Sequence, residues 1–580
     1  MQNSWDILEK YRGTAIAGEW PTITEQFHIS TTEYPQAACF TAFGKEKVSY
    51  TYEEVSAYVE KAADHLIENG VKPGDNIILT GKNTPYWGIA YLAILEAGAV
   101  IVPIDYQLDN ETIERLIDYA ESTVLIVDKE KYEELSIGET SPIKTRIALC
   151  DENDQFILDL KAKAHNKPRR TENDLAAILY TSGTTGNEKG VMLTHKNFMS
   201  DVYQACHDMF LGASQEDVWY ALLPLHHSYC MTAVFLEGIK FGSEIVFAQR
   251  LVVPQIMKDL KQGNITMFMA IPLLYNKILQ GMMKQVRAKG LAVHLYIGLM
   301  MKISGLIKKI FHKNPGKVIF ASLLKKANLD NLRILICGGG PLAPETFRRY
   351  NQLGLDFVQG YGLTETSPIL TLNPTAHFKV DSVGKVFPLV EMKIIDKDEQ
   401  GTGEIIVKGP NVTTGYYNNT EATEELFTED GYLKTGDVGY LDSENYLYLT
   451  GRKKSLIVTE GGKNVFPEEI EDHFQLDVQI EQMMVRGYIA NRETKSEGIE
   501  AVILPNTEYF NSKGIYNKKK IIEEIVEVIR DHNKELLPYK RIGRLRVIEE
   551  ALEMTTTQKI KRPKVDALIE KTDPGILEKI

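Results

Sequence analysis

Short apolar runs alternate with helical patterns along most of the chain. Residues 76–80, 100–103 and 123–127 are apolar runs with many β-branched side chains, which is typical of buried strands. Residues 87–99, between the first two runs, have the length and apolar content of a buried helix. Strands that alternate with helices in this way predict parallel sheets whose faces are covered by helices.

The pattern changes between residues 385 and 449. Short strands there are separated by Gly- and Asn-rich turns, which indicates an antiparallel, β-barrel-like part. The chain becomes more charged after Arg452, and residues 520–531 have the spacing of an amphipathic helix. We therefore expect an α/β multidomain protein. Its large N-terminal domain, residues 1–451, would hold two helix-covered sheets and the barrel-like part, and residues 452–580 would form a small α+β domain.

The composition of the chain excludes some classes of function. The 580 residues have ordinary globular usage, with 43% hydrophobic and 25% charged residues. The net charge of −13 argues against a general nucleic-acid binder, whose surface is usually basic. The five cysteines are scattered without CxxC spacing, so neither a disulfide framework nor a zinc site is expected. We expect a cytoplasmic chain, because the N-terminus lacks a secretory pattern and no uncharged apolar run of about 18 residues predicts a spanning helix.

One segment departs from the average charge. Residues 261–329 contain no Asp or Glu but twelve Lys and Arg residues. Inside this segment, six apolar residues recur at helical spacing: Leu291, Leu295, Leu299, Ile303, Leu306 and Ile310. Three lysines fall together on another face of the same helix: Lys302, Lys309 and Lys313. An apolar stripe beside a cationic face is typical of an interfacial helix, so residues 291–313 are a candidate contact with an anionic membrane. A core helix with a solvated basic face explains the pattern comparably well.

The strongest chemical signal is the loop at residues 180–190, Tyr-Thr-Ser-Gly-Thr-Thr-Gly-Asn-Glu-Lys-Gly, which follows the apolar strand 175–179. Glycines allow the backbone to approach an anion closely, hydroxyls and amides can donate hydrogen bonds, and Lys189 adds a positive charge. The loop is not a Walker A motif, because Gly190 stands where that motif has Ser or Thr. Taken alone, the loop indicates phosphate binding and a flexible turn equally well.

Four further segments follow in order. They are Gln-Gly-Tyr-Gly-Leu-Thr-Glu at 359–365, Tyr-Leu-Lys-Thr-Gly-Asp at 432–437, Gly-Arg-Lys-Lys at 451–454 and Thr-Thr-Thr-Gln-Lys-Ile at 555–560. Together with the phosphate loop, they resemble the signature segments of the AMP-forming adenylating enzymes, which include acyl-CoA synthetases, luciferases and nonribosomal adenylation domains. The resemblance covers about residues 40–565. The basic insertion, at about residues 277–326, makes the chain most similar to bacterial long-chain fatty acyl-CoA ligases.

The resemblance implies a two-step reaction. A fatty acid, of long chain, would attack the α-phosphate of ATP to give acyl-AMP and pyrophosphate, and CoA would then displace AMP. Mg²⁺ would be the cofactor, and ATP and CoA the co-substrates. Two alternatives stay open: acyl carrier protein as the acceptor, which could also dock on the basic segment, and a scaffold that binds nucleotide without catalysis. The expected location is cytoplasmic, with peripheral contact to the inner face of a membrane through residues 291–313.

The resemblance also assigns residues to the nucleotide. The phosphate loop would contribute Thr181, Ser182, Gly183, Thr184, Thr185, Gly186 and Lys189. Glu365 would hold Mg²⁺, and Thr364 would donate to the α-phosphate. Adenine and ribose would contact Gly339, Gly340, Pro341, Gly360, Tyr361, Gly362, Asp437 and Arg452. A dinucleotide-binding interpretation of the Gly339 turn is weak, because the turn lacks GxGxxG spacing.

The remaining assignments concern the acyl group and the thiol. Lys559 would be the catalytic lysine of adenylation, and the acyl pocket would be lined by the catalytic His227 together with Ser228 and Tyr229. The small, mobile C-terminal domain would rotate at the hinge residue Lys454, and the thiol channel would then include Gly461, Gly462 and Lys463. Two positions depart from the family pattern: Gln558 replaces the usual Gly before the lysine, and Glu188 replaces Pro in the phosphate loop. No Cys or acid pair accompanies His226 and His227, so zinc is not expected there.

Overall fold

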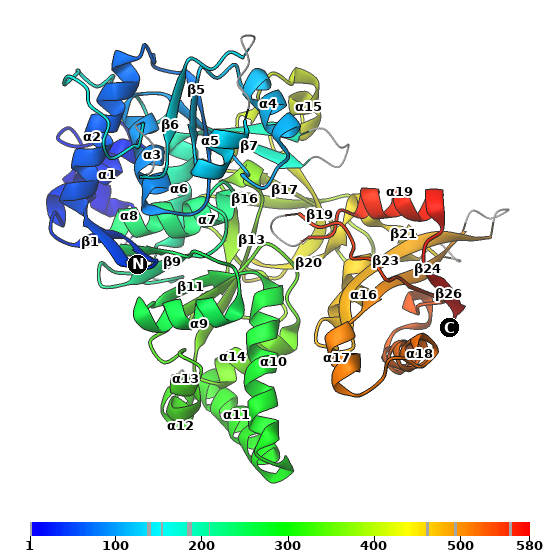
Figure 1. Cartoon of the computed structure of the whole chain (residues 1–580). Helices are drawn as coiled ribbons and strands as arrows, with labels where there is room; N and C mark the ends of the chain where they lie inside the picture. The colour runs from blue at the N-terminus through cyan, green and yellow to red at the C-terminus, as the bar shows by residue number, and fades with distance from the viewer. Residues whose placement is uncertain are drawn as a thin grey trace.

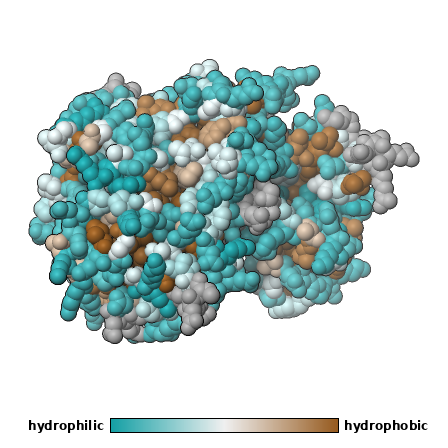
Figure 2. Space-filling view, turned by 90° about the horizontal axis from the view of Figure 1, so that it is seen from above, coloured by the Kyte–Doolittle hydropathy of each residue, from teal (hydrophilic) through white to brown (hydrophobic). Residues whose placement is uncertain are grey.

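The computed structural model describes residues 3–135, 141–151, 155–182, 188–207, 209–311, 313–459, 463–491, 496–555 and 559–580. The chain forms a large N-terminal domain and a small C-terminal domain (Figure 1). Seen from above, the small domain lies beside the large one (Figure 2). The predicted α/β multidomain class is confirmed, since mixed sheets alternate with helices throughout.

The first sheet of the large domain has seven strands. Its order is β18 (Gly415–Tyr416), β8 (Glu188–Thr194), β7 (Leu175–Ser182), β4 (Val100–Ile104), β3 (Asn76–Thr80), β5 (Val124–Val127) and β6 (Thr145–Ala148). The strands from β4 to β6 are parallel, as the alternation with helices predicts. β7 and β8 instead pair antiparallel, and residues 183–187 of the predicted phosphate loop, which come between them, lie outside the described residues.

The second sheet has thirteen strands. Its order is β16 (Glu391–Ile395), β17 (Gly403–Lys408), β19 (Leu433–Leu441), β20 (Tyr446–Arg452), β15 (Gly384–Val386), β14 (Ile369–Leu372), β13 (Asp356–Gly362), β12 (Ile334–Cys337), β11 (Met267–Ala270), β9 (Val218–Ala221), β10 (Glu244–Phe247), β1 (Ala38–Phe43) and β2 (Lys47–Thr51). The expectation of a separate β-barrel-like part is wrong. The antiparallel strands are present, but β15 pairs with both β14 and β20, so they extend the large sheet and close no barrel among the described residues.

Helices cover and separate these sheets. Those of the large domain are α1 (Ile23–Glu33), α2 (Tyr52–Glu68), α3 (Pro85–Glu96), α4 (Asn110–Tyr119), α5 (Lys129–Glu134), α6 (His195–Ala205), α7 (Ser228–Cys230), α8 (Glu237–Phe241), α9 (Val253–Gln262), α10 (Pro272–Ala288), α11 (Leu291–Phe311), α12 (Gly316–Ile319), α13 (Ala321–Lys326), α14 (Pro344–Gln352) and α15 (Thr420–Leu426). α3 contacts β3 and β4 of one sheet and β1 of the other. Because it is buried on every side, its sequence is apolar all round.

The C-terminal domain has its own sheet and core. β23 (Ile480–Asn491), β24 (Ser496–Pro505), β25 (Arg544–Val547) and β26 (Ile576–Lys579) form the sheet, beside the short hairpin β21 (Ile457–Val458) and β22 (Asn464–Val465). Its helices are α16 (Pro467–Phe474), α17 (Thr507–Ser512), α18 (Lys518–Glu535) and α19 (Arg562–Thr572). The predicted amphipathic helix is α18, whose Ile522, Ile525 and Ile529 are buried in this core.

α10 and α11 project from the lower end of the large domain (Figure 1). α11 is long and apolar enough by composition to cross a membrane, although its lysines interrupt the uncharged run that the sequence analysis required. One face of α11 is fixed on the domain through Met301, Ser304 and Lys308. The ammonium of Lys308 contacts Asp356 at 2.7 Å and donates to Asn351 at 2.8 Å. A buried, paired lysine therefore anchors the helix.

A side-chain amide at the end of α16 is among the contacts between the two domains. Oε1 of Gln475 accepts from the backbone N–H of Ala343 at 2.9 Å, and its Nε2 donates to the carbonyl of Pro341 at 3.1 Å. Nε2 also donates to Asp472 at 2.7 Å, which orients the amide. Gln475 thus joins the small domain to the turn that precedes α14.

We expect Lys308→Met to loosen α11. The variant keeps the aliphatic stem but removes the charge-assisted bonds to Asp356 and Asn351, at a cost of about 1–2 kcal/mol. Amide hydrogen exchange across residues 301–311 should therefore accelerate roughly tenfold. Lys309→Met is the matched control, because Lys309 is the next residue along α11 and its side chain is exposed. Equal exchange in the two variants would contradict the anchoring role of Lys308.

We expect Gln475→Ala to loosen the contact between the domains. The variant leaves the N–H of Ala343 and the carbonyl of Pro341 without their partner in the small domain, a loss of about 1–2 kcal/mol. Hydrogen exchange at residues 341–347 should rise, and small-angle scattering should show a broader range of dimensions. Asn511→Ala, at an exposed site on α17, serves as the control. Unchanged exchange at the turn would mean that other contacts hold the domains together.

Candidate active site

The first group of predicted residues lies at the edge of the seven-stranded sheet. Because β8 pairs with β18, the ammonium of Lys189 lies 4.8 Å from the centre of the Tyr416 ring. The Tyr416 hydroxyl donates to Oε1 of Glu365 at 2.8 Å. The backbone carbonyl of Glu365 accepts from the N–H of Thr413 at 2.8 Å. The fold thus brings a cation and a carboxylate from distant segments to the same tyrosine.

Glu365 has the chemistry that Mg²⁺ requires. Its side chain is half-buried, and the bond to Tyr416 uses Oε1 and leaves Oε2 outside it. Mg²⁺ prefers hard oxygen ligands and keeps several waters, so one carboxylate together with phosphate oxygens of a nucleotide can hold it. The residues present therefore fit a magnesium ion at Glu365.

The backbone at Glu365 is shaped by a close approach of two chain segments. β13 ends at Gly362, and the 3-10 turn Thr364–Thr366 follows. A Cβ atom at Gly362 would lie 1.6 Å from the carbonyl oxygen of Pro368, so a side chain cannot be accommodated there. The glycine therefore permits the turn that carries Thr364 and Glu365.

A second group centres on a buried carboxylate, that of Asp437. The Tyr361 hydroxyl donates to its Oδ2 at 2.7 Å, and Nε of Arg452 lies 3.0 Å from its Oδ1. The register of the sheet sets this arrangement, because Asp437 on β19 stands opposite Arg452 on β20. The carboxylate raises the pKa of Arg452, and burial raises the pKa of Tyr361 well above its ordinary value. A carboxylate has about four lone-pair sites, so Asp437 can accept further hydrogen bonds.

The small domain brings Lys559 to this second group. Its backbone N–H donates to Thr555 Oγ1 at 3.1 Å, and its carbonyl accepts from the N–H of Thr555 at 2.7 Å, so Thr555 holds the backbone of Lys559. The surrounding protein and the charge of Arg452 lower the pKa of Lys559 to about 8, against the opposing effect of Asp437. Because this pKa is above 7, the ammonium form prevails at pH 7.

The predicted acyl segment approaches the same place. The Ser228 hydroxyl donates to Thr364 Oγ1 at 3.4 Å, which joins this segment to the turn beside Glu365. Burial, followed by the charges of His226 and Lys559, lowers the pKa of His227 well below its ordinary value. Burial also lowers the pKa of His226 to about 3, so its 3.8 Å contact with Asp105 is not an ion pair at neutral pH. Both imidazoles are therefore neutral.

The glycine-rich turn packs on the acyl segment. A Cβ atom at Gly338 would lie 3.0 Å from the ring of Tyr229, whose hydroxyl donates to the carbonyl of Ile336 at 3.4 Å. Gly339 has a φ of +80°, a conformation that favours glycine. Pro341, which follows Gly340, accepts the bond from Gln475 described above. The turn thus lies between the acyl segment and the small domain.

Several predicted residues are not placed in these groups. Six lie outside the described residues: Gly183, Thr184, Thr185, Gly186, Gly461 and Gly462, and Gln558 does as well. Thr181 and Ser182 end β7 next to the phosphate loop, and Gly360 lies in β13. Lys454 lies exposed in the 3-10 turn directly after β20. Lys463 is exposed in the hairpin of β21 and β22, and none of the contacts described for Asp437 includes it.

Sequence reasoning missed Tyr416, Thr435 and Gln475. Thr435 Oγ1 accepts from the backbone N–H of Asp437 at 3.1 Å and so supports the carboxylate. Tyr416 and Gln475 act through partners more than fifty residues away along the chain. No local pattern marks them. The segment 432–437 did contain Thr435, but as part of a motif and not as a residue with a role of its own.

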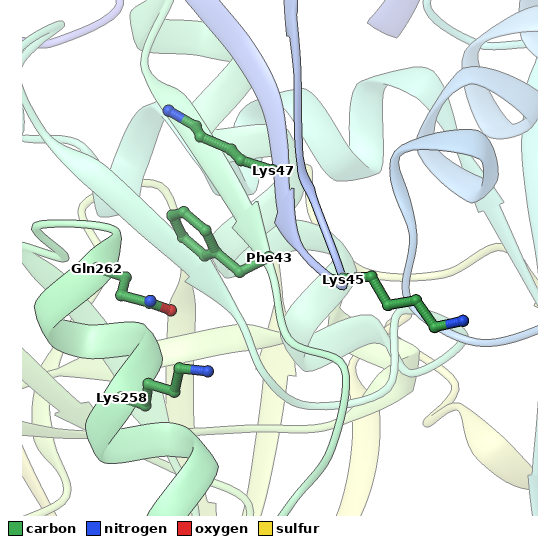
Figure 3. A pocket seen from close by; sticks show the side chains of 6 residues that line it. Phe43, Lys45, Lys47, Lys258 and Gln262 are labelled. Carbon is green, nitrogen blue, oxygen red and sulfur yellow. The ribbon is translucent and has the colours of Figure 1, made fainter.

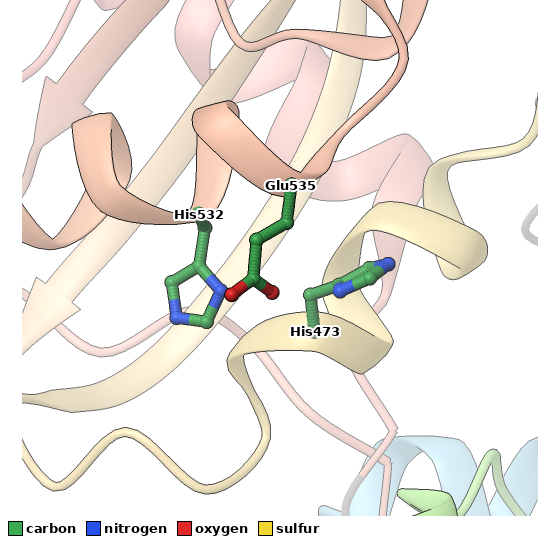
Figure 4. A group of neighbouring side chains, drawn as sticks. All are labelled: His473, His532 and Glu535. Atoms are coloured by element: carbon green, nitrogen blue, oxygen red, sulfur yellow. The ribbon is translucent and has the colours of Figure 1, made fainter.

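Two other features lie apart from these groups. An open depression is lined by Phe43, Gly44, Lys45, Lys47, Lys258 and Gln262 (Figure 3), and it contains none of the predicted residues. His473, His532 and Glu535 of the small domain form a cluster whose ligand atoms lie within 4.8 Å of one another (Figure 4). Two imidazoles do not suit Mg²⁺, which prefers oxygen ligands. Neither feature competes with Glu365 as the magnesium site.

Comparison with known proteins places the chain in a family. It is 28% identical over 555 residues to the long-chain-fatty-acid–CoA ligase FadD15 of Mycobacterium bovis, covering 88% of this chain and 89% of that protein. It is 27% identical to the 2-succinylbenzoate–CoA ligase of Listeria monocytogenes, covering 92% and 96%. The fold matches that of ATP-bound MatB from Rhodopseudomonas palustris with a TM-score of 0.74, at 23% identity, over 95% and 99% of the two chains. The sequence model of AMP-binding enzymes matches residues 27–417, more than half of the chain. The protein therefore belongs to the AMP-binding enzyme family.

Proposed function

We propose that the protein is an AMP-forming acid–CoA ligase whose substrate is a fatty acid of long chain. Family membership and the two CoA-ligase relatives support the general reaction, which is activation of a carboxylic acid by ATP and transfer to CoA. The observation that carries the proposal is the position of Lys559. The small domain holds its ammonium within electrostatic reach of Asp437, Arg452 and His227, where the nucleotide and acyl segments meet.

The first step joins two anions. A carboxylate oxygen attacks the α-phosphorus of ATP, and the new P–O bond forms as the bond to pyrophosphate breaks. Such a step depends on positioning and on charge neutralisation. Lys559 would neutralise charge on the carboxylate and the α-phosphate, and Thr364 would donate to the α-phosphate. Mg²⁺ held at Glu365 would neutralise charge on the other phosphates.

The proposal also gives roles to the remaining groups of the first step. Asp437 would accept from the two ribose hydroxyls, since a carboxylate can take several hydrogen bonds. Tyr361 would pack on adenine beside the Gly339 turn. The neutral rings of His226 and His227 would border an uncharged acyl site, because burial keeps both imidazoles unprotonated. An uncharged, largely buried border suits an apolar acyl group better than a second charged group.

The second step requires a different arrangement. The sulfur of CoA, as its thiolate, attacks the acyl carbon. The new S–C bond forms as the C–O bond to AMP breaks, and AMP leaves with the electron pair. Lys559 would have to leave for the thiol to enter, and rotation at Lys454 would exchange it for the hairpin that carries Lys463. The exposed position of Lys454 directly after β20 supports a hinge there. The bonds of Gln475 to the turn before α14 are among those that the rotation would break.

The substrate class is tested by a panel of acids. The full chain is supplied with ATP, Mg²⁺ and CoA, together with hexadecanoate, octanoate or 2-succinylbenzoate, and AMP release is measured. We expect the highest kcat/KM with the long-chain acid, because each added methylene that is buried contributes about 0.8 kcal/mol. A preference for the aromatic acid would contradict the fatty-acid proposal and leave the ligase proposal intact.

The same assay separates the alternatives for the acceptor and for catalysis. Release of AMP with holo acyl carrier protein but not with CoA would identify the carrier protein as the acceptor. Absence of ATP–pyrophosphate exchange with every acid would identify a scaffold that binds nucleotide without catalysis.

The role of Lys559 is tested through pH. The ammonium form is the active one and its pKa in the free enzyme is about 8, so kcat/KM for pyrophosphate release should fall above pH 8. An ordinary lysine would delay this fall to about pH 10.4. Lys559→Ala should lower the rate about a hundredfold or more. Lys559→Arg should keep part of the activity and lose the fall, because a guanidinium stays charged.

The matched control is Lys564→Ala, which removes a nearby exposed lysine that pairs with Glu553. Its rate and pH profile should equal those of the unmodified protein. An unchanged pH profile in Lys559→Arg would assign the fall to another group and contradict the proposed role.

A further inference from the structure

α11 presents a continuous apolar face to solvent. The six residues that recur at helical spacing are each 41–66% exposed: Leu291, Leu295, Leu299, Ile303, Leu306 and Ile310. Val318 of α12, next along the chain, is 82% exposed. Only 17% of the most apolar stretch of α11 is buried in the protein. These residues, with Val318, form what we term the apolar face, and its exposure excludes a core helix.

The helix is tied to its own domain through α10 and α14. Lys308 binds Asp356 and Asn351 on one side of α11. Beyond the helix, Gly316 packs so closely on Gly354 that a Cβ atom on Gly316 would lie 2.6 Å from the backbone nitrogen of Gly354. At its other end, α11 contacts α10 of the same domain. Because one face of α11 is held by its own domain, the opposite, exposed face can lie along a membrane surface.

Positive charge borders the apolar face. Lys302 and Lys309 follow one edge of it along α11, and further exposed lysines continue beyond the helix: Lys313, Lys317, Lys325 and Lys326. Residues 261–329 contain no acidic residue. The face visible in Figure 2, seen from above, is by contrast mostly hydrophilic with scattered apolar side chains. An apolar face with a cationic border is the composition of a helix that binds at the lipid–water interface.

We propose that α11, with α12 and α13, docks on a bilayer that contains anionic lipid. A second copy of the chain would cover the apolar face but would bring two sets of lysines together. An acidic carrier protein would pair with the lysines but would leave the apolar face in water. A bilayer satisfies both features, because acyl chains cover the apolar face while headgroup phosphates pair with the border.

The benefit of membrane contact for catalysis rests on the proposed function, because a fatty-acid substrate itself partitions into membranes. Membrane binding does not rest on it, because α11 contains none of the residues assigned to the reaction. Lipid binding and acid activation can therefore be measured separately, and one can fail without the other.

The test is flotation of the full chain with vesicles. We expect the protein to float with vesicles of phosphatidylcholine and phosphatidylglycerol, to float far less with phosphatidylcholine alone, and to lose binding as salt increases. Each lysine near an anionic leaflet strengthens binding about fivefold, so Lys302→Glu/Lys309→Glu should weaken binding at least roughly thirtyfold. Leu299→Ser/Leu306→Ser should weaken it through the apolar face. Lys519→Glu/Lys520→Glu, at exposed sites on α18, is the charge-matched control.

Four results would overturn the lipid proposal: absence from both kinds of vesicle, an equal loss in the α18 control, unchanged flotation of both α11 variants, or dimers that the leucine variant abolishes. ATP–pyrophosphate exchange with a short, soluble acid should be unchanged in all three variants. Loss of flotation with normal exchange therefore contradicts only the lipid proposal. Normal flotation without exchange by any acid contradicts only the proposed function.

Discussion

The active-site arrangement depends on the concentration of positive charge around one buried carboxylate. Arg452 lies 3.0 Å from Asp437, and the ammonium of Lys559 is close enough to Arg452 for their repulsion to lower the pKa of the lysine. Glu468 and Glu365 also act on Arg452, but more weakly than Asp437 does. Two cations beside the Asp437 carboxylate favour an added anion, and a nucleotide phosphate or a carboxylate is such an anion. The same repulsion favours departure of the lysine once the anionic leaving group has gone, which suits a domain that must move between two steps.

The two positive charges are held in different ways. Arg452 ends β20 and is fixed by the register with β19, and Tyr361 reaches the same carboxylate from β13 of the same sheet. The large sheet therefore presets the carboxylate, the arginine and the tyrosine. Lys559 comes from the small domain, and its backbone N–H donates to Thr555. Its position depends on weak contacts such as those of Gln475, and contacts of that strength can be exchanged at modest cost.

Local pattern predicted those parts of the fold that local forces decide. The strands β3, β4 and β5 and the helix α3 follow from apolar runs and their spacing. The barrel-like part was wrong because β15 pairs with β20, which is distant in sequence, as well as with its neighbour β14, and no local pattern encodes the distant pairing. The motif residues around Asp437 and Glu365 were accessible through resemblance. Tyr416 and Gln475 were not, because each acts through a partner that only the folded chain brings near.

The basic segment shows why a count of charges is a poor guide to a surface. Lys308 is one of its twelve positive residues, yet it is buried and paired with Asp356, so it holds α11 to the domain and offers nothing to a partner. Its neighbour Lys309 faces solvent beside the apolar face. α11 packs on α14, and α14 begins directly after the turn that Gln475 contacts. A bilayer bound to α11 would therefore hold the large domain, with its preset carboxylate, and leave the small domain to move. A docking surface on the part that does not rotate is compatible with a catalytic cycle that needs rotation, whereas one on the small domain would oppose it.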